Sequence, residues 1–400
     1  MLRVSIVGCG KIADSHAEQI RRINDCEIVA VCDREELMAK QLAERFSIKM
    51  FFSDIQDLLD KARPDVVHIT TPPQSHFELG RLCLERGCHI YVEKPFTVDT
   101  PQALELIRMA EQRGLKVTVG HDGQFSHAAN RLRELVRQGY LGGDPVHMES
   151  HYCYDLGTGS YANAILGDKN HWVRRLPGKL LHNTIGHGIA RIAEHLKSDA
   201  PTVIAHGFIS PALRARGEQE MIDELRVIIT ERGGATAYLT FSAQMRPSLH
   251  QFRIFGPRNG LFLDEDEQVV LRLRGGRFKS YAEKFGPPLV YTRQYLGNLV
   301  RNARLFLAND FHMKSGMKNL IEAFYQSITH NSPLPIAYRE ILLISRICDD
   351  IFQQVNQSRC ESDGNGWPGS AAGANAADGL RLLQPNDAVH REGDSPRAAL

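Results

Sequence analysis

A glycine-rich turn at the start of the chain limits the folds open to it. A strand-like stretch, residues 2–7, runs directly into G-C-G-K-I-A at positions 8–13, and a helical pattern follows. Gly8 permits a tight turn, Gly10 lets the backbone approach a pyrophosphate, and Ala13 lets helix and strand pack closely. The helix N-terminus offers unpaired N–H donors to an anion. This arrangement predicts a dinucleotide-binding turn whose cofactor contacts come from Gly8, Gly10, Lys11 and Ile12.

The next predicted strand supports the same interpretation. Residues 28–32 are apolar and end in Asp33, whose carboxylate can accept both ribose hydroxyls of an adenosine. We therefore predict NAD as the cofactor; Arg34 could pair with a 2′-phosphate, so NADP stays open. The alternative is a tight turn that binds nothing. A helix is predicted between these two strands, because its apolar positions, Ile12, His16, Ile20 and Ile23, recur at helical spacing.

Composition excludes several classes of function. Four hundred residues with 42% hydrophobic content suffice for two domains. A formal net charge of +1 provides no field that would attract nucleic acid or an anionic membrane, so neither is expected as a partner. No run approaches the roughly 18 apolar residues of a membrane span, and the start does not resemble a signal peptide. The eight cysteines form no C-x-x-C pair. We expect a cytoplasmic protein with reduced thiols and no bound metal.

Residues 1–122 alternate between strand and helix patterns, which predicts a parallel sheet covered by helices, a Rossmann domain. Ser53 with Gln56 resembles a capping box, and Thr100 with Pro101 a helix start. The later strands of this domain are predicted at 66–70, 89–92 and 116–119.

Residues 123–356 follow another pattern and predict an α+β domain for substrate binding and oligomerisation, with a large open sheet rich in antiparallel strands. One helix is expected near 128–138, and two late ones, at 316–329 and 339–355, one of which should pack back near the first domain. Residues 357–400, rich in Gly, Ala, Ser, Asp and Pro, predict a disordered tail. Strands are expected at 146–154, 202–209, 225–230, 236–241, 252–255 and 269–273.

Lys94 is the first catalytic candidate. The strand 89–92 runs into Glu93-Lys94-Pro95, which puts a lysine at the carboxyl end of a parallel strand, the edge where such sheets bind ligands. The plainer alternative is a surface lysine that pairs with Glu93. Pro95 favours a functional role, because proline restricts the chain direction where the side chain must be aimed.

At this point the sequence closely resembles the Gfo/Idh/MocA family of nicotinamide-dependent oxidoreductases, over residues 1 to about 355. The resemblance rests on several motifs in order, which are the G-C-G-K-I-A turn, Thr70-Thr71-Pro72-Pro73 with His76, Glu93-Lys94-Pro95, Gly120-His121, and the segment Gly178 to His187. It implies a Rossmann domain followed by an open-faced sheet domain, Lys94 beside the nicotinamide and the reacting oxygen, and frequent homodimers or homotetramers. By the same resemblance, Thr71, Pro72, His76, Glu93, Lys94 and His121 are expected to contact the cofactor.

A second catalytic candidate lies at Asn183 and His187. The segment looks like a helix start with Asn183 as its N-cap, and the spacing of four puts both side chains on one face. Family members that act on polyols carry an aspartate four residues before a histidine, where the carboxylate orients the imidazole. Asn183 can orient the ring but supplies no negative charge, so His187 is expected to be a weaker base, or the reaction to run as a reduction. The alternatives are a plain helix cap and a buried histidine, with His182 as a substitute in another register.

Three further residues complete the predicted substrate site. Gln124 stands where the family often has arginine, which changes the expected substrate contact. The aromatic-rich stretch from Tyr152 to Tyr161, together with Trp172, could stack on a sugar ring or simply pack in the core.

His147, Glu149, His151 and Cys153 alternate along one strand. Residues two apart in a strand lie about 7 Å from each other, too far to share one tetrahedral zinc, so no metal is predicted.

These residues predict hydride transfer between a nicotinamide and a carbinol carbon of a sugar, a sugar nucleotide or a cyclitol. Lys94 would stabilise the developing alkoxide and His187 would exchange the proton. Reduction of an imine or a conjugated double bond on the same fold is an alternative. A dinucleotide-sensing regulatory protein without catalysis is a third, which Asn183 keeps open.

Overall fold

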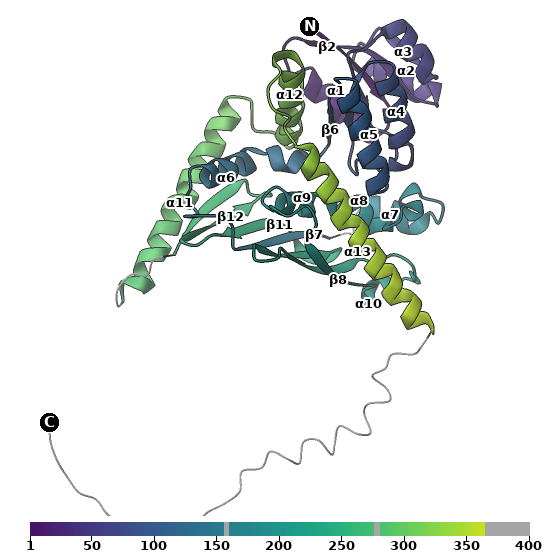
Figure 1. The fold of residues 1–400 in the computed structure, drawn as a ribbon. Helices are drawn as coiled ribbons and strands as arrows, with labels where there is room; N and C mark the ends of the chain where they lie inside the picture. The colour runs from purple at the N-terminus through teal and green to yellow at the C-terminus, as the bar shows by residue number, and fades with distance from the viewer. Residues whose placement is uncertain (156–159, 276–280, 365–400) are drawn as a thin grey trace, which may run out of the picture. The chain divides into compact units, whose positions relative to one another are not determined.

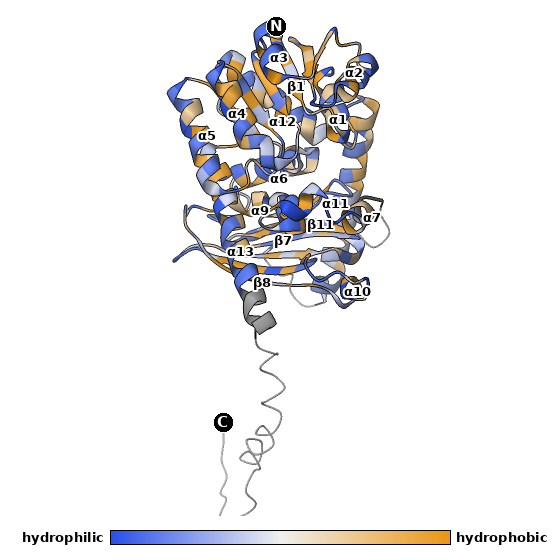
Figure 2. Ribbon diagram, turned by 90° about the vertical axis from the view of Figure 1, so that its right-hand side faces the viewer, coloured by the Kyte–Doolittle hydropathy of each residue, from blue (hydrophilic) through white to orange (hydrophobic). Residues whose placement is uncertain are grey.

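The structure is a computed structural model that describes residues 1–155, 160–275 and 281–364. Met1–Val355 forms one compact unit, to which the following description applies. Two sheets with helices between them make up this unit (Figures 1 and 2). No helix among the described residues is long and apolar enough to span a membrane.

The first sheet has six parallel strands in the order β3-β2-β1-β4-β5-β6, so the chain reverses its direction of travel across the sheet between β1 and β4. Apolar strands such as β4 are buried along their whole length, because helices cover both faces. The predicted Rossmann domain is confirmed. Its elements are β1 (Leu2–Val7), α1 (Lys11–Ile20), β2 (Cys26–Cys32), α2 (Glu36–Arg45), β3 (Met50–Phe52), α3 (Ile55–Ala62), β4 (Val66–Ile69), η1 (Pro73–Ser75), α4 (His76–Glu85), β5 (His89–Val92), α5 (Thr100–Gln112) and β6 (Val117–Val119).

Two predicted helix caps are wrong by one residue. Asp54, not Ser53, caps α3, since its carboxylate accepts from the N–H groups of Gln56 and Asp57. Asp99 caps α5 in the same way, and Thr100 is the first helical residue. Aspartate, serine and threonine are all good caps, so adjacent candidates cannot be separated without the backbone geometry.

The second sheet has seven strands in the order β13-β12-β11-β7-β10-β9-β8, all antiparallel except the pair β7 and β10. The six predicted strands are present, and β12 is a seventh that the prediction missed. The strands are β7 (His147–Asp155), β8 (Thr202–Phe208), β9 (Glu224–Thr230), β10 (Thr236–Ser242), β11 (Gln244–Phe255), β12 (Asn259–Asp264) and β13 (Val269–Arg274).

Among the described residues, helices cover one face of this second sheet. Residues of α6, α8, α9 and α13 share a hydrophobic core with its inward side chains. On the other face, Ile204, Ile228 and Tyr238 form a row across β8, β9 and β10 and are 58%, 42% and 49% exposed. The short helices are η2 (Asp122–Phe125), α6 (His127–Arg137), α7 (Ser160–Gly167), η3 (Trp172–Arg175), α8 (Lys179–Thr184), α9 (Gly186–Ala193) and α10 (Pro211–Arg214).

Three long helices complete the chain, α11 (Ala282–Leu307), α12 (Ser315–His330) and α13 (Tyr338–Gly364). The expectation that a late helix returns to the first domain is confirmed, because Leu320 and Phe324 of α12 lie in the Rossmann core. The division into 1–122 and 123–356 stays a proposal, as α12 belongs to the later segment by sequence. Helix α13 continues beyond the predicted boundary at 357, and residues 365–400 of the predicted tail lie outside the described residues.

The prediction missed α11 altogether. Its sequence holds Gly286, Pro287 and Pro288 within the second turn of the helix, residues that usually end one. The contacts of this helix with the edge of the second sheet outweigh that local preference.

Candidate active site

The glycine-rich turn lies at the carboxyl end of β1. Gly8 has a φ of +96°, and a Cβ there would lie 2.7 Å from Cγ2 of Thr71, so glycine is required. A Cβ on Gly10 would meet nothing within 4 Å. No side chain caps the N-terminus of α1, which leaves its first N–H groups available. This open cradle fits the pyrophosphate of a dinucleotide.

Asp33 lies beside the turn at the end of β2. Its Oδ2 accepts a 2.6 Å hydrogen bond from the Cys9 N–H, and Oδ1 accepts one of 3.0 Å from Glu35. The carboxylate therefore braces the turn in addition to its predicted ribose contact. Arg34, Lys11 and Pro72 are exposed and Thr71 and Ile12 partly exposed, so these predicted contacts are accessible.

His76 is placed differently from its prediction. The ring is completely buried, and Nε2 and Nδ1 lie 2.8 and 2.9 Å from the carbonyl oxygens of Thr71 and Pro95; the neutral ring donates to one of the two. It joins the loop after β4 to the loop after β5 and does not face a ligand. We correct its role from a cofactor contact to a support for both loops.

Glu93 is also directed inward. Its Oε1 lies 2.8 Å from Nε2 of His16, whose Nδ1 lies 2.8 Å from Nδ1 of His68. His68 Nε2 in turn lies 2.8 Å from the hydroxyl of Tyr325 on α12. The sequence pattern treated His16 as an apolar position, but the structure shows a buried polar chain. Glu93 positions the lysine loop, since its Oε2 accepts from the Lys94 N–H at 3.2 Å.

Lys94 reaches from the first sheet to the second domain. Its Nζ donates to the backbone oxygen of Asn183 at 2.9 Å and lies 3.5 Å from Oδ1 of the same residue. Burial lowers the pKa of Lys94, while the carboxylates of Glu93 and Asp122 act in the opposite direction. An ammonium with a lowered pKa exchanges protons more readily near neutral pH.

His187, on α9, lies close to this lysine. Burial is the main cause that lowers its pKa well below the usual value, and the nearby positive charge of Lys94 adds to it. The imidazole is therefore neutral at physiological pH and can accept a proton. Its ring lies 5.7 Å from that of His121 and 5.5 Å from that of Tyr152, measured between centroids.

Asp122 was not predicted as a site residue. It follows β6, and its Oδ1 lies 4.0 Å from Nδ1 of His187. Burial raises the pKa of this carboxyl, and Lys314 opposes the shift. The only feature of the sequence that could have indicated Asp122 is its position directly after Gly120-His121, at the carboxyl edge of the sheet. A carboxylate beside the histidine is thus present, although position 183 lacks one.

Comparison with known proteins identifies relatives of the nucleotide-binding part of the chain. Residues 2–121 match a family model described as the oxidoreductase family with an NAD-binding Rossmann fold. The nucleotide-binding domain belongs to the Gfo/Idh/MocA family. Over 142 residues the chain is 37% identical to D-glucoside 3-dehydrogenase of Escherichia coli (strain K12), a match that covers 35% of this chain and 40% of the relative.

Two more similarities extend the comparison. The chain is 32% identical over 133 residues to UDP-N-acetylglucosamine 3-dehydrogenase of Acidithiobacillus ferrooxidans, which covers 33% of this chain and 41% of the relative. It therefore matches less than half the length of these curated relatives. The solved WlbA dehydrogenase from Bordetella pertussis, in complex with NADH and UDP-GlcNAcA, has a TM-score of 0.71 at 14% identity, and covers 89% of this chain and 96% of its own. That likeness shows the fold.

Asn183 is not the predicted helix cap. It is buried in α8, which begins after Gly178, and a separate helix, α9, carries His187. The two helices meet at Ile185. Asn183 contacts Lys94 and so joins the two domains.

Gln124 is turned inward, and the substrate contact of Trp172 stays a prediction. The Gln124 side chain is buried and donates to Glu340 at 2.7 Å and to Glu194 and the Ala190 carbonyl at 3.2 Å each. We correct its predicted substrate contact to a structural one. Trp172 is partly buried against the second core, and its carbonyl accepts from Gln74. Tyr161 has no described side chain, and residues 156–159 lie outside the described residues.

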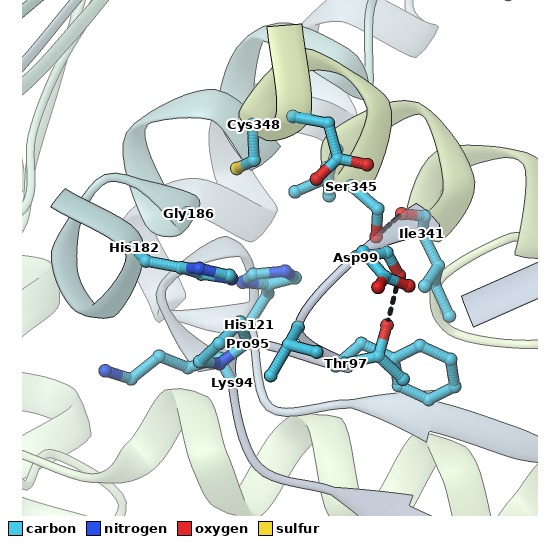
Figure 3. Close-up of a pocket in the computed structure, with 14 residues that line it drawn as sticks. Lys94, Pro95, Thr97, Asp99, His121, His182, Gly186, Ile341, Ser345 and Cys348 are labelled. Atoms are coloured by element: carbon cyan, nitrogen blue, oxygen red, sulfur yellow. Dashed lines mark hydrogen bonds between the residues drawn. The ribbon is translucent and has the colours of Figure 1, made fainter. Parts of the chain in front are cut away.

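A small cavity of about 20 Å³ lies behind the Lys94 loop. Its wall includes His121, His182 and Cys348, and Figure 3 shows the Lys94 ammonium directed away from Asp99 and α13. Burial lowers the pKa of His121 and of His182 to about 4. His182 packs its ring 4.7 Å from that of Phe352. This histidine therefore packs against α13 and lines the same cavity as Lys94.

Among the residues that the structure describes, no group of three or more His, Cys, Asp or Glu side chains could hold a metal ion. His147 instead binds Thr236 through Nδ1 at 2.7 Å.

Proposed function

We propose that this chain is an NAD(P)-dependent oxidoreductase that transfers hydride between the nicotinamide and a carbinol carbon of a sugar, a sugar nucleotide or a cyclitol. One observation carries the proposal. The partly buried side chains of Lys94 and His187 come from segments far apart in the chain, and Lys94 Nζ donates at 2.9 Å to the carbonyl of Asn183, at the end of the helix directly before the one that carries His187. The names of the relatives, which act on a glucoside and a nucleotide sugar, support the substrate class.

The bound cofactor would supply the hydride chemistry, held by the turn at Gly8 and Gly10 and by Asp33. Lys94 has three N–H donors, and its described partner is Asn183. At least one donor remains for the oxygen of the reacting hydroxyl. A positive charge at that oxygen stabilises the alkoxide that develops as the carbon–hydrogen bond breaks.

His187 would take the hydroxyl proton. Burial keeps its ring neutral, which is the form that a general base requires. Asp122 lies on the Nδ1 side, so a small approach of the two groups would orient the ring with Nε2 toward the substrate. Asp122 thereby fills the role that an aspartate at position 183 has in polyol-acting members of the family. The proposal does not require a reaction limited to reduction.

A ligand screen tests the proposal. Sugars, nucleotide sugars and cyclitols are added with NAD or NADP, and both the melting temperature and the absorbance at 340 nm are followed. A ligand bound only by the folded protein raises the melting temperature. We expect at least one compound to stabilise the protein in the presence of cofactor and to change the absorbance.

Two outcomes would contradict this function. Tight NADH binding without an absorbance change across the panel would indicate a sensing protein. Turnover of imines or conjugated double bonds, with no alcohol oxidised, would assign the site to the other reaction class.

A further inference from the structure

The outward face of α11 carries a row of exposed apolar side chains. We define the apolar stripe as seven side chains of this helix, which are Phe285 (70% exposed), Leu289 (71%), Leu296 (59%), Leu299 (64%), Val300 (45%), Phe306 (69%) and Leu307 (83%). A soluble surface seldom exposes more than a few hundred Å² of contiguous apolar area. A stripe of this kind therefore marks an interaction surface.

The spacing of the stripe is that of a helix-pairing seam. Positions 285, 289, 292, 296, 299, 303 and 306 follow steps of four and three without interruption. Thr292 and Ala303 occupy the two places of this series that lie outside the stripe. A 4-3 repeat sustained over three heptads is the pattern by which one helix packs against another along its length. An isolated surface helix would need no such register.

Contacts with the sheet fix the rotation of α11, which runs along one edge of the second sheet (Figure 1). Gln294 and Asn298 exchange hydrogen bonds with the backbone of Arg272 and Val270 on the edge strand β13. Asn302 donates to the Glu267 carbonyl at 3.3 Å. These amides recur every four residues, so they lie on one helix face. The apolar stripe is consequently held on the opposite side, toward solvent.

The exposed area matches what a stable contact needs. At about 150–200 Å² for each side chain, the exposed fractions of the stripe sum to roughly 800 Å². This is about the area that each partner of a standard interface buries. One helix of comparable length and apolar content would cover it. Among the described helices of this chain, α12 and α13 already pack in the two cores.

We propose that α11 pairs with α11 of a second copy of this chain, antiparallel about a two-fold axis near Leu296. In that arrangement Leu289 lies opposite Ala303, and Phe285 opposite Leu307. The large side chain of Leu289 thus packs against the small one of Ala303, and Phe285 packs against Leu307 at each end of the paired helices. Because the contact is two-fold and uses the same surface on both copies, it closes without forming fibres. It is separate from the exposed row Ile204, Ile228 and Tyr238, and does not depend on the proposed function.

Sedimentation velocity of the full chain tests the pairing. We expect Leu296→Glu with Leu299→Glu to remove one two-fold association step, with at least a tenfold increase in the dissociation constant. The matched control is Arg304→Glu, which alters the formal charge of the same helix by the same amount but lies beside the stripe. Unchanged circular dichroism and NADH binding would establish that both variants are folded.

Cross-linking tests the position of the axis. Leu296→Cys should give a reducible dimer on a non-reducing gel, whereas wild type and Arg304→Cys should not. An unchanged mass for the double glutamate variant, or dissociation by Tyr238→Glu alone, would overturn the proposal. It would also be overturned if the wild type were a monomer that binds phosphatidylserine vesicles through the stripe.

Discussion

The two sheets of this protein differ in how much of their surface is covered. Strand β4 of the first sheet is buried along its whole length, whereas β8 of the second alternates between exposed and partly buried positions. The first sheet delivers Lys94 from a loop at the end of a buried strand. The second delivers His187 from a helix lying on its covered face. Active-site precision thus comes from strand ends in one domain and from helix packing in the other.

Lys94→Met should produce the largest effect, because it removes the contribution of the first sheet to the chemistry. We expect turnover to fall by about 1,000-fold or more, as for the loss of a charge that stabilises a developing anion. NADH affinity, measured by fluorescence titration, should change less than about threefold, which is under 1 kcal/mol. Lys49→Met, an exposed lysine of the same domain, is the control. A Lys94→Met protein that stays active would end the catalytic assignment.

Acid should destabilise both halves. Burial lowers the pKa of His68, His76 and His121 in the first half and of His182, His187 and His195 in the second. A histidine whose folded pKa lies below the unfolded value of about 6.5 binds fewer protons in the folded state, so stability falls as pH drops below 6.5.

Glu340 acts in the opposite direction, since burial raises its pKa to about 7 and folding then favours its protonated form as pH falls. Burial also raises the pKa of Asp122, Asp349 and Asp350, so the six histidines oppose four carboxyls. We expect the free energy of unfolding to decrease by about 3 kcal/mol between pH 7 and pH 5, measured by urea titration. Equal stability at both pH values would contradict the buried neutral histidines.

Asp122→Asn tests whether Asp122 orients His187, the proposed base. We expect turnover to fall by about 10- to 100-fold, with His187→Ala showing at least the same loss. Because a negative neighbour favours the imidazolium, its removal should move the acidic limb of the pH–rate profile to lower pH. An unshifted profile with reduced stability would make Asp122 a structural residue only.

Alanine substitutions at Gly8 and Gly10 should produce the smallest effects, and the two should differ in whether stability or NADH affinity changes. Gly8→Ala introduces a Cβ against Thr71 at positive φ and should cost about 2 kcal/mol of stability, seen in the melting temperature. Gly10→Ala meets nothing, so stability should change by less than about 0.5 kcal/mol, while NADH affinity falls about tenfold. Equal effects of the two variants on NADH affinity and melting would contradict the separate roles.

Much of the fold was predictable because its signals are local. The glycine turn, the alternation of strands and helices to Val119, and the strand-end position of Lys94 each depend on a short segment. Helix α11 was missed, because adjacent prolines in its second turn act against a helix locally, while amide contacts from Gln294 and Asn298 to β13 stabilise it from elsewhere. His16 was read as apolar because spacing reports which face is buried and not which chemistry is buried there.

The amino-acid sequence by itself determined the parallel sheet, the dinucleotide turn and the lysine at its edge, since each follows from residues adjacent in the chain. Only the tertiary structure decided that Asp122 stands beside His187, that His76 and Gln124 turn inward, and that Asn183 receives Lys94. These pairings join residues far apart in the chain. They depend on which elements meet in space, and no local pattern carries that information.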